Sequence, residues 1–271
     1  MSKKESETLK EVFEARKATP FCFIRQGGNQ GDNMIYEGAC KLAYDVGLNY
    51  REIMGYKPSR VESIRKGEII YVHGGGGFCT WWNWTPRLLH QLDKDYPDNL
   101  IIVGPSSVAL QDWYLKKWLP KRRNLIFFAR EYTSFNYLKD NFYPDVKLDH
   151  DTGMYLKVGD TRLAIVLHGE PVKKMRKVCC LREDPESSNT IPEEVAKRID
   201  AGYFHQVVDP CQTNEWGKIH ASACEIWTNR SHSAILGATL GTRTYMFAGA
   251  YHKNRSIYEY SLKKKGVKWV K

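Results

Sequence analysis

Short apolar segments that alternate with helix-like stretches recur along the whole chain, and they constrain its fold more than any other feature. Continuous apolar strands joined by helices are typical of parallel sheets that are covered on both faces. The sequence therefore predicts an α/β fold. The expected strands are residues 21–25, 50–53, 68–73, 100–103, 125–129, 146–148, 178–181, 204–208, 225–228, 243–247 and 267–270.

The series of strands is interrupted around residues 157–177, where Gly159, Gly169 and Pro171 occur with a basic run. We place a domain boundary in this interruption and expect an N-terminal domain of residues 1–160 and a C-terminal domain of residues 161–271. Both are expected to be Rossmann-like and to face each other across a cleft. Ligand groups in such folds lie at the carboxyl ends of the strands.

Composition narrows the class of protein. The chain has 271 residues, of which 42% are hydrophobic, so a sizeable core is expected. Its apolar runs are too short for a membrane span, and no signal-peptide pattern follows Met1, so we expect a cytoplasmic protein. The seven cysteines are an odd number without a Cys-x-x-Cys pair, which supports neither a disulfide framework nor a zinc site.

The formal charge of +10 includes basic runs at residues 116–123, 173–177 and 263–271. Nucleic acid, an anionic membrane surface or a multiply charged small substrate would each suit such runs. No nucleic-acid motif is present, and the aromatic residues do not alternate with basic ones as in a stacking groove. We therefore expect no nucleic-acid partner and leave peripheral association with the inner face of a membrane open.

Residues 224–241 read as a buried strand, a tight turn and a helix. Arg230 and His232 lie in the turn, where unpaired peptide N–H groups and the helix dipole favour anions. A guanidinium binds an oxyanion through two hydrogen bonds, and an imidazole moves a proton near neutral pH. This pattern predicts a ligand site, with a solvated turn as the ordinary alternative.

Two glycine-rich segments follow predicted strands. In residues 26–33, Asp32 or Asn33 is expected to cap the next helix, and the segment matches neither a dinucleotide-binding motif nor a Walker loop. Four glycines follow His73, and their entropic cost favours the close approach of a ligand to the backbone over tight packing. The nearby Trp81, Trp82 and Trp84 suit the apolar face of a sugar, but a place in the core is favoured.

Charged residues end several other strands. Arg130 and Glu131 follow residues 125–129, where the carboxylate is expected to orient the guanidinium, and a structural ion pair is the alternative. Asp149 and Asp151 flank a histidine, but further metal ligands at suitable spacing are missing, so no metal is expected. Arg182 and Lys253 complete the set of candidate anion contacts in the second half.

Together these motifs resemble those of the polysaccharide pyruvyl transferase family. The resemblance rests on residues 28–32, 73–77, 129–131, 151, 230–241 and 251–253, which occur in the order expected for the family. It implies a GT-B-like pair of Rossmann domains and transfer of the enolpyruvyl-derived group of phosphoenolpyruvate to a sugar, forming a pyruvate ketal. It also implies functional roles for Arg130, Arg230 and His232. Ser231 between Arg230 and His232, and Thr152 after Asp151, depart from the usual pattern and leave the choice of acceptor open.

The expected chemistry needs no cofactor or metal, because phosphoenolpyruvate is itself the donor substrate. This donor carries about three negative charges and needs several cations or helix N-termini. His232 is the candidate general acid, and either Asp32 or Glu131 is the base. The expected substrate contacts are Arg130, Arg230, Arg182, Lys253, Asn29, Gly75, Gly76 and Asp151.

The acceptor is expected to be a saccharide, free or lipid-linked, in the synthesis of a capsule, an exopolysaccharide or another cell-surface glycan. Two other functions remain open: a nucleotide-sugar glycosyltransferase of the same fold, and a non-catalytic carbohydrate- or membrane-binding protein. The sequence does not specify the acceptor sugar, which hydroxyl groups are bridged, or the oligomeric state.

Overall fold

The computed structural model describes residues 7–55, 64–119, 124–141, 145–169, 175–188, 190–213 and 215–271. Parts of two predicted basic runs, residues 120–123 and 173–174, lie outside these ranges. The chain divides into two compact units, one of residues 1–27 and 39–152 and the other of residues 28–38 and 153–271. The expected division at residue 160 had assigned residues 28–38 to the first domain. They belong to the second unit, whose core includes Met34.

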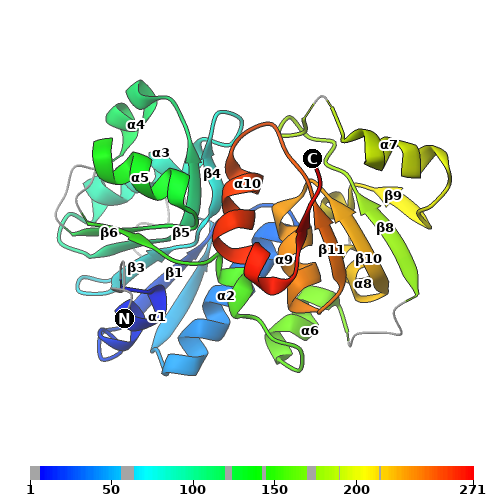
Figure 1. Ribbon diagram of the computed structural model, residues 1–271. Coiled ribbons are helices and arrows are strands. Elements are labelled where there is room, and N and C mark those ends of the chain that lie inside the picture. Colours follow the sequence, from blue (N-terminus) through cyan, green and yellow to red (C-terminus); the bar gives the residue numbers. More distant parts are fainter. Residues whose placement is uncertain are drawn as a thin grey trace, which may run out of the picture. The chain divides into compact units, whose positions relative to one another are not determined.

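The first unit contains a parallel sheet whose strand order is β2-β1-β3-β5-β6-β7, with β4 paired to β5 (Figure 1). The chain leaves β1 toward β2 and then returns to β3 on the other side of β1. The strands, as far as the chain is described, are β1 (Phe21–Arg25), β2 (Tyr50–Met54), β3 (Ile69–Val72), β4 (Gly75–Cys79), β5 (Ile101–Ala109), β6 (Leu125–Ala129) and β7 (Val146–Leu148).

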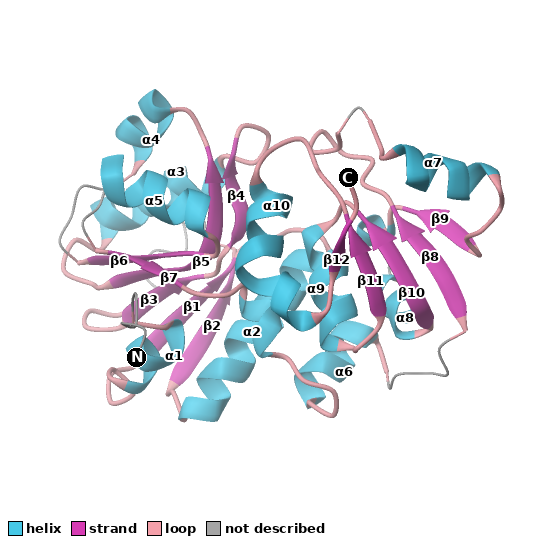
Figure 2. Ribbon diagram, viewed as in Figure 1, coloured by secondary structure: helices cyan, strands magenta, loops and turns pink. Residues whose placement is uncertain are grey.

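Helices cover this sheet (Figure 2). Thr8 and Glu11 form a capping box at the start of the first helix, whose Phe13 packs edge-on against Phe21 and Tyr71. Its backbone is also tied to β7, because Leu9 N donates to Asp149 at 2.7 Å. The helices are α1 (Leu9–Glu14), α3 (Trp84–Asp95), α4 (Asp112–Trp118) and α5 (Tyr132–Asn141), and α2 (Gln30–Val46) contributes its second half.

The second unit contains a parallel sheet of order β12-β11-β10-β8-β9. The chain leaves β8 toward β9 and then returns to β10 on the other side of β8. The point between β8 and β10 is therefore a topological switch point. The described strands are β8 (Arg176–Cys180), β9 (Gln206–Val208), β10 (Ala223–Thr228), β11 (Arg243–Met246) and β12 (Lys268–Trp269).

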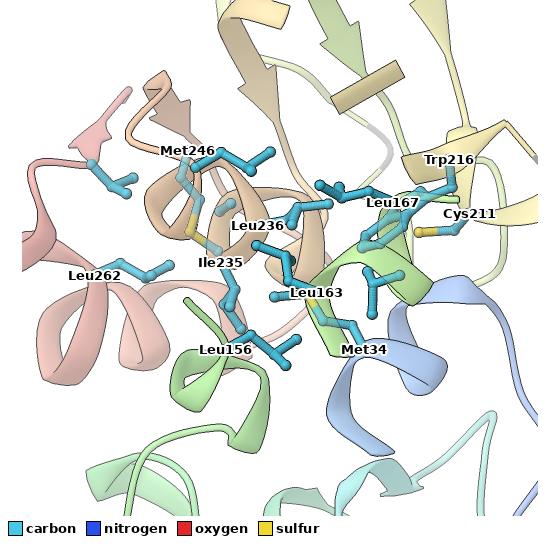
Figure 3. Close-up of a cluster of buried hydrophobic side chains, with 14 of the residues drawn as sticks. Met34, Leu156, Leu163, Leu167, Cys211, Trp216, Ile235, Leu236, Met246 and Leu262 are labelled. Atoms are coloured by element: carbon cyan, nitrogen blue, oxygen red, sulfur yellow. The ribbon is translucent and has the colours of Figure 1, made fainter. Parts of the chain in front are cut away.

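Alternate residues of the second sheet pack against different helices. Cys180 and Ile226 lie in one apolar cluster with Ile219, whereas Cys179 and Trp227 lie in another with Val195. A third, larger cluster joins side chains from α2, α6 and α9 (Figure 3). The helices are α6 (Thr161–Leu167), α7 (Glu193–Asp200), α8 (Trp216–Ala221), α9 (Ser231–Thr239) and α10 (Lys253–Ile257), which continues into a π-helical turn, Tyr258–Leu262.

The observed strands confirm the predicted α/β class with parallel sheets, and most lie within a residue or two of the expected bounds. The exceptions are β5, which runs six residues further than predicted, from the expected end at 103 to Ala109, and β4, which was not predicted. In the described residues, no helix has the length and apolar character needed to cross a membrane.

Candidate active site

The carboxyl ends of β8 and β10 meet at the switch point of the second sheet. Arg182 follows β8, and its backbone N–H donates to the Asn229 side chain at 2.7 Å. Asn229 and Arg230 follow β10 and lead directly into α9. Ligands of open α/β sheets bind outside such strand ends. This place in the fold is therefore the candidate site in the second unit.

The first turn of α9 is held by side chains from its neighbours. Arg230 is the N-terminal cap of the helix, and its backbone N–H donates to the Thr228 hydroxyl at 2.9 Å. Asn254 of α10 donates to the carbonyl groups of Asn229 and Phe247, and it accepts from the Ser231 hydroxyl at 2.8 Å. These bonds fix the turn that carries Arg230 and His232.

His232, the second residue of α9, lies against the first turn of α2. A Cβ atom on Gly31 would come within 2.0 Å of His232 Nδ1 and 2.6 Å of its Cγ. The ring therefore occupies space that only a glycine leaves open. Because Gly31 is also the second residue of its helix, the N-termini of α2 and α9 converge on one imidazole. Both N-termini are the positive ends of helix dipoles.

The start of α2 corrects the predicted cap. Asn29, rather than Asp32 or Asn33, is the N-terminal cap, since its side chain accepts from Gly31 N at 2.8 Å. Asp32 lies three residues on and accepts from Asn29 N at 2.9 Å, so both side chains help to cap the first turn. The helix starts earlier than expected because residues 30 and 31 already belong to it.

The cations expected to bind the donor form an alternating chain with three carboxylates. Arg182 contacts Asp184 at 2.6 Å and Glu186 at 2.8 Å. Lys253 also pairs with Glu186, while Arg230 pairs with both Asp184 and Asp209. The chain runs in the order Lys253, Glu186, Arg182, Asp184, Arg230 and Asp209.

Cations within this ion-pair chain lower the pKa of the Glu186 carboxyl group. Burial by itself raises the pKa of Glu186, but Lys253 and Arg182 lower the pKa below its ordinary value, so the carboxylate is ionised. Three positive and three negative side chains therefore balance one another. Arg182, Lys253 and Glu186 also line a narrow depression, too small to hold a water molecule, together with Asn229, Gly249, Ala250, Tyr251 and Asn254.

Charged side chains of the ion-pair chain and of the first turn of α2 both influence the pKa of one buried thiol, that of Cys211. Burial raises the pKa of this thiol to about 12, and the charges of Arg230, Asp209, Arg182 and Asp32 also affect it. The structure thus brings together six of the predicted site residues within the second unit. They are Asn29, Asp32, Arg182, Arg230, His232 and Lys253.

The other predicted residues lie in the first unit. Arg130 is 1% exposed and pairs with Asp151 at 2.7 Å, and it also donates to the Ser107 hydroxyl at 2.8 Å. The observed partner of Arg130 is thus a carboxylate from the end of β7, whereas the sequence had pointed to the adjacent Glu131. This pair lies at the carboxyl ends of β5, β6 and β7.

Glu131 and Asp149 have structural contacts. Glu131 is fully buried and accepts hydrogen bonds from both the backbone N–H and the hydroxyl of Ser134, so it caps α5. Asp149 accepts from Leu9 N and from the adjacent His150 N. In the parts of the chain that are described, no three His, Cys, Asp or Glu side chains are grouped to hold a metal ion.

Three of the four glycines after His73 belong to β4, and Gly74 precedes this strand. A Cβ on Gly74 would lie 2.2 Å from the Pro105 carbonyl oxygen, so close packing against β5 requires a glycine there. Gly75, which pairs with Ser106, is buried, and Gly76 is half-buried. The expectation that ligand approach outweighs packing is wrong for Gly74.

Sequence reasoning did not single out Gly31 as the contact of His232, nor the acidic partners in the ion-pair chain. Asp184 and Asp209 each precede a proline and follow a predicted strand closely, which is the one signal that pointed to them. Asn254, which is adjacent to Lys253, was not singled out, because its role depends on contacts with residues that are distant in sequence. The residues missed are Gly31, Asp184, Glu186, Asp209 and Asn254.

Two solved structures were compared with this chain, and the likeness to the first shows a shared fold. A crystal structure of a functionally uncharacterised protein from Klebsiella pneumoniae has 17% identity and a TM-score of 0.72, and the match covers 97% of this chain and 96% of that one. The E. coli heptosyltransferase WaaC with ADP-2-deoxy-2-fluoro heptose matches at 9% identity and a TM-score of 0.43, covering 93% of each chain. No match was found among curated protein sequences.

The polysaccharide pyruvyl transferase family model matches residues 29–251. This span begins at the cap of α2 and includes every predicted site residue of the second unit except Lys253, as well as those of the first unit. It covers most of the chain, the glycines after His73 and residues 29–33 of the first glycine-rich segment, so the likeness is not confined to one motif. The chain therefore belongs to the polysaccharide pyruvyl transferase family and is a transferase with a role in polysaccharide modification.

Proposed function

We propose that this protein transfers the enolpyruvyl-derived group of phosphoenolpyruvate to a sugar and forms a cyclic pyruvate ketal in the synthesis of a capsule, an exopolysaccharide or another cell-surface glycan. The observation that carries this proposal is the position of His232, whose ring lies at the N-termini of α9 and α2. A proton donor is thus held where two helices favour an anion.

The proposed donor site uses backbone as much as side chains. The ion-pair chain has no net charge, so Arg182 and Lys253 attract a triply charged donor only weakly at long range. The helix dipoles that end beside His232 supply partial positive charge for a phosphate. Arg230, the cap of α9, supplies the guanidinium closest in sequence to that turn.

The structure favours Asp32 over Glu131 as the proposed base. Glu131 is fully buried and its carboxylate caps α5 through Ser134, whereas Asp32 is half-buried in the same helical turn as Gly31. A base must come within hydrogen-bond reach of the acceptor hydroxyl. Both carboxylates accept hydrogen bonds at the start of a helix, but only Asp32 is partly exposed and can reach an acceptor hydroxyl.

In the proposed reaction, His232 donates its proton to the methylene carbon of phosphoenolpyruvate. The adjacent carbon becomes oxocarbenium-like, and one sugar hydroxyl forms a C–O bond to it while Asp32 takes the hydroxyl proton. A second hydroxyl then forms the other C–O bond as the bond to phosphate breaks. Its proton leaves with the phosphate, Asp32 releases its proton to solvent, and the imidazole takes one up from solvent. The products are a pyruvate ketal and inorganic phosphate.

The test compares His232→Ala with His205→Gln, a change at an exposed histidine of the same unit. Purified proteins receive phosphoenolpyruvate and a panel of glycosides, and phosphate release and acceptor mass are measured. General acid catalysis is typically worth about 10²–10⁴-fold, so His232→Ala should lose at least 100-fold in turnover while His205→Gln keeps it. A melting temperature close to that of the parent shows that the fold persists.

Two results would overturn the proposal. Normal phosphate release by His232→Ala would remove this residue from the reaction. Failure of the parent protein to modify any glycoside, combined with stabilisation by a nucleotide sugar and not by phosphoenolpyruvate in thermal-shift measurements, would favour a nucleotide-sugar glycosyltransferase.

A further inference from the structure

Four tryptophans in the first unit have exposed indole rings. Trp81, Trp82 and Trp84 are 41%, 40% and 40% exposed, and Trp113 is 60% exposed. The sequence had favoured a place in the core for the first three, which is wrong. Tryptophan is highly buried on average, so several exposed indole groups in neighbouring segments need an explanation.

The two segments that carry these residues lie side by side. The Tyr114 hydroxyl donates to the Asn83 carbonyl group at 3.0 Å, and Arg87 donates to the Tyr114 hydroxyl at 2.7 Å. The Trp113 and Tyr114 rings are in edge contact at 5.5 Å. Helix α4 is thereby fixed to the loop between β4 and α3. We call the four exposed indole groups on this support the tryptophan patch.

Positive charge accompanies the tryptophan patch. Lys116 and Lys117 are exposed on α4, and Arg87 is exposed on α3. Lys117 also lies over the Trp118 ring at 5.0 Å. The acidic residue of α4, Asp112, is hydrogen-bonded by the Tyr137 hydroxyl. The named side chains beside the tryptophan patch thus comprise three cations and one carboxylate.

We propose that the tryptophan patch, with Lys116, Lys117 and Arg87, binds the surface of an anionic phospholipid bilayer. Indole rings prefer the boundary between acyl chains and headgroups, because one edge is polar and the remainder apolar. Exposed lysines near such a boundary gain from the negative potential of acidic lipids, by about fivefold in affinity for each residue. A short helix that carries both kinds of residue is suited to lie in the interface plane.

The charge of this surface favours a membrane over a neutral glycan. An aromatic platform alone suits a sugar ring, but a neutral sugar gains little from two lysines and an arginine beside it. Acidic headgroups gain from all three. The proposal does not depend on the identity of the donor or on the roles of His232 and Asp32.

The test uses the full chain and vesicles of phosphatidylcholine with and without phosphatidylglycerol, separated by sedimentation. The parent protein should sediment with the vesicles that contain phosphatidylglycerol, and less at high salt. Replacing Trp81, Trp82 and Trp113 by alanine should reduce the bound fraction at least tenfold. Lys116→Gln with Lys117→Gln should lower the affinity for these vesicles by about 25-fold, since each lysine contributes about fivefold.

Matched controls change the same kinds of group elsewhere. Lys263→Gln with Lys264→Gln removes two exposed lysines from the second unit, and Tyr44→Ala removes an aromatic side chain that is 78% exposed. Both controls should bind as the parent does. Circular dichroism verifies that each variant is folded.

The proposal is overturned if the parent protein does not bind phosphatidylglycerol vesicles. It is also overturned if the Lys263–Lys264 control loses binding to the same extent as the α4 variant. Trp-dependent binding of soluble oligosaccharides without vesicle binding would likewise reject it and assign the patch to the acceptor. Turnover on a soluble glycoside is measured in parallel, so failure of membrane binding is distinguished from failure of the proposed reaction.

Discussion

At the scale of single residues, the absence of a side chain at Gly31 matters as much as the presence of His232. We predict that Gly31→Ala displaces the imidazole, because the new Cβ would lie 2.0 Å from Nδ1, 2.6 Å from Cγ and 2.9 Å from the Cβ of His232. Moving the ring tip alone does not relieve contacts that extend to Cβ. Phosphate release from phosphoenolpyruvate should fall by at least tenfold.

The higher helix propensity of alanine, by about 1 kcal/mol, offsets part of the overpacking cost of about 1–3 kcal/mol, so the variant should still fold. Gly27→Ala is the matched control, since nothing lies within 4 Å of its added Cβ. Turnover and urea unfolding are measured for both variants. Full activity in Gly31→Ala would show that the position of His232 is not required.

At the scale of elements, α10 holds the ends of two strands through one buried side chain. Asn254 is 1% exposed and bonds to Asn229, Phe247 and Ser231. We predict that Asn254→Ala lowers the free energy of unfolding by about 2–3 kcal/mol, because it leaves buried polar partners unsatisfied. The change is measured by urea unfolding.

The same element also positions the candidate acid, so activity should fall with stability. Asn141→Ala is the control, because Asn141 makes one exposed hydrogen bond, to the Tyr137 carbonyl group. This control should lower the free energy of unfolding by less than about 0.5 kcal/mol. If Asn254→Ala unfolds at the same urea concentration as the parent, the turn before α9 is held by other contacts.

Elements were predictable where the signal is local. The apolar run at 125–129 gave β6 with its exact bounds, since a buried parallel strand is a continuous apolar segment. Strand β4 was missed, because its glycines carry no apolar pattern and it forms through pairing with β5. The partners of Arg230 were missed for a related reason: Asp184 and Asp209 are distant in sequence and meet only at the switch point.

At the scale of the whole molecule, both units contain a buried histidine, and these residues make the free energy of unfolding depend on pH. Burial lowers the pKa of His73 in the first unit and of His220 in the second to about 4. Charge from Arg25 adds to the shift at His73, and the hydrogen bond to the Trp216 carbonyl group opposes it at His220. Both rings are therefore neutral in the folded protein at neutral pH.

These lowered pKa values predict loss of stability in acid. The unfolded chain binds protons near pH 6.5 and the folded chain only near pH 4, so the free energy of unfolding falls as the pH is lowered through this window. Each histidine should contribute a loss of about 2 kcal/mol between pH 7 and pH 5.

His220→Gln should remove the share of His220, because a glutamine amide also donates to a carbonyl group but does not titrate. His90→Gln, at a half-buried histidine, should leave the dependence as it is in the parent. Urea unfolding at pH 5, 6 and 7 measures the three proteins, and an equal loss in the parent and in His220→Gln would show that proton uptake at His220 does not destabilise the second unit.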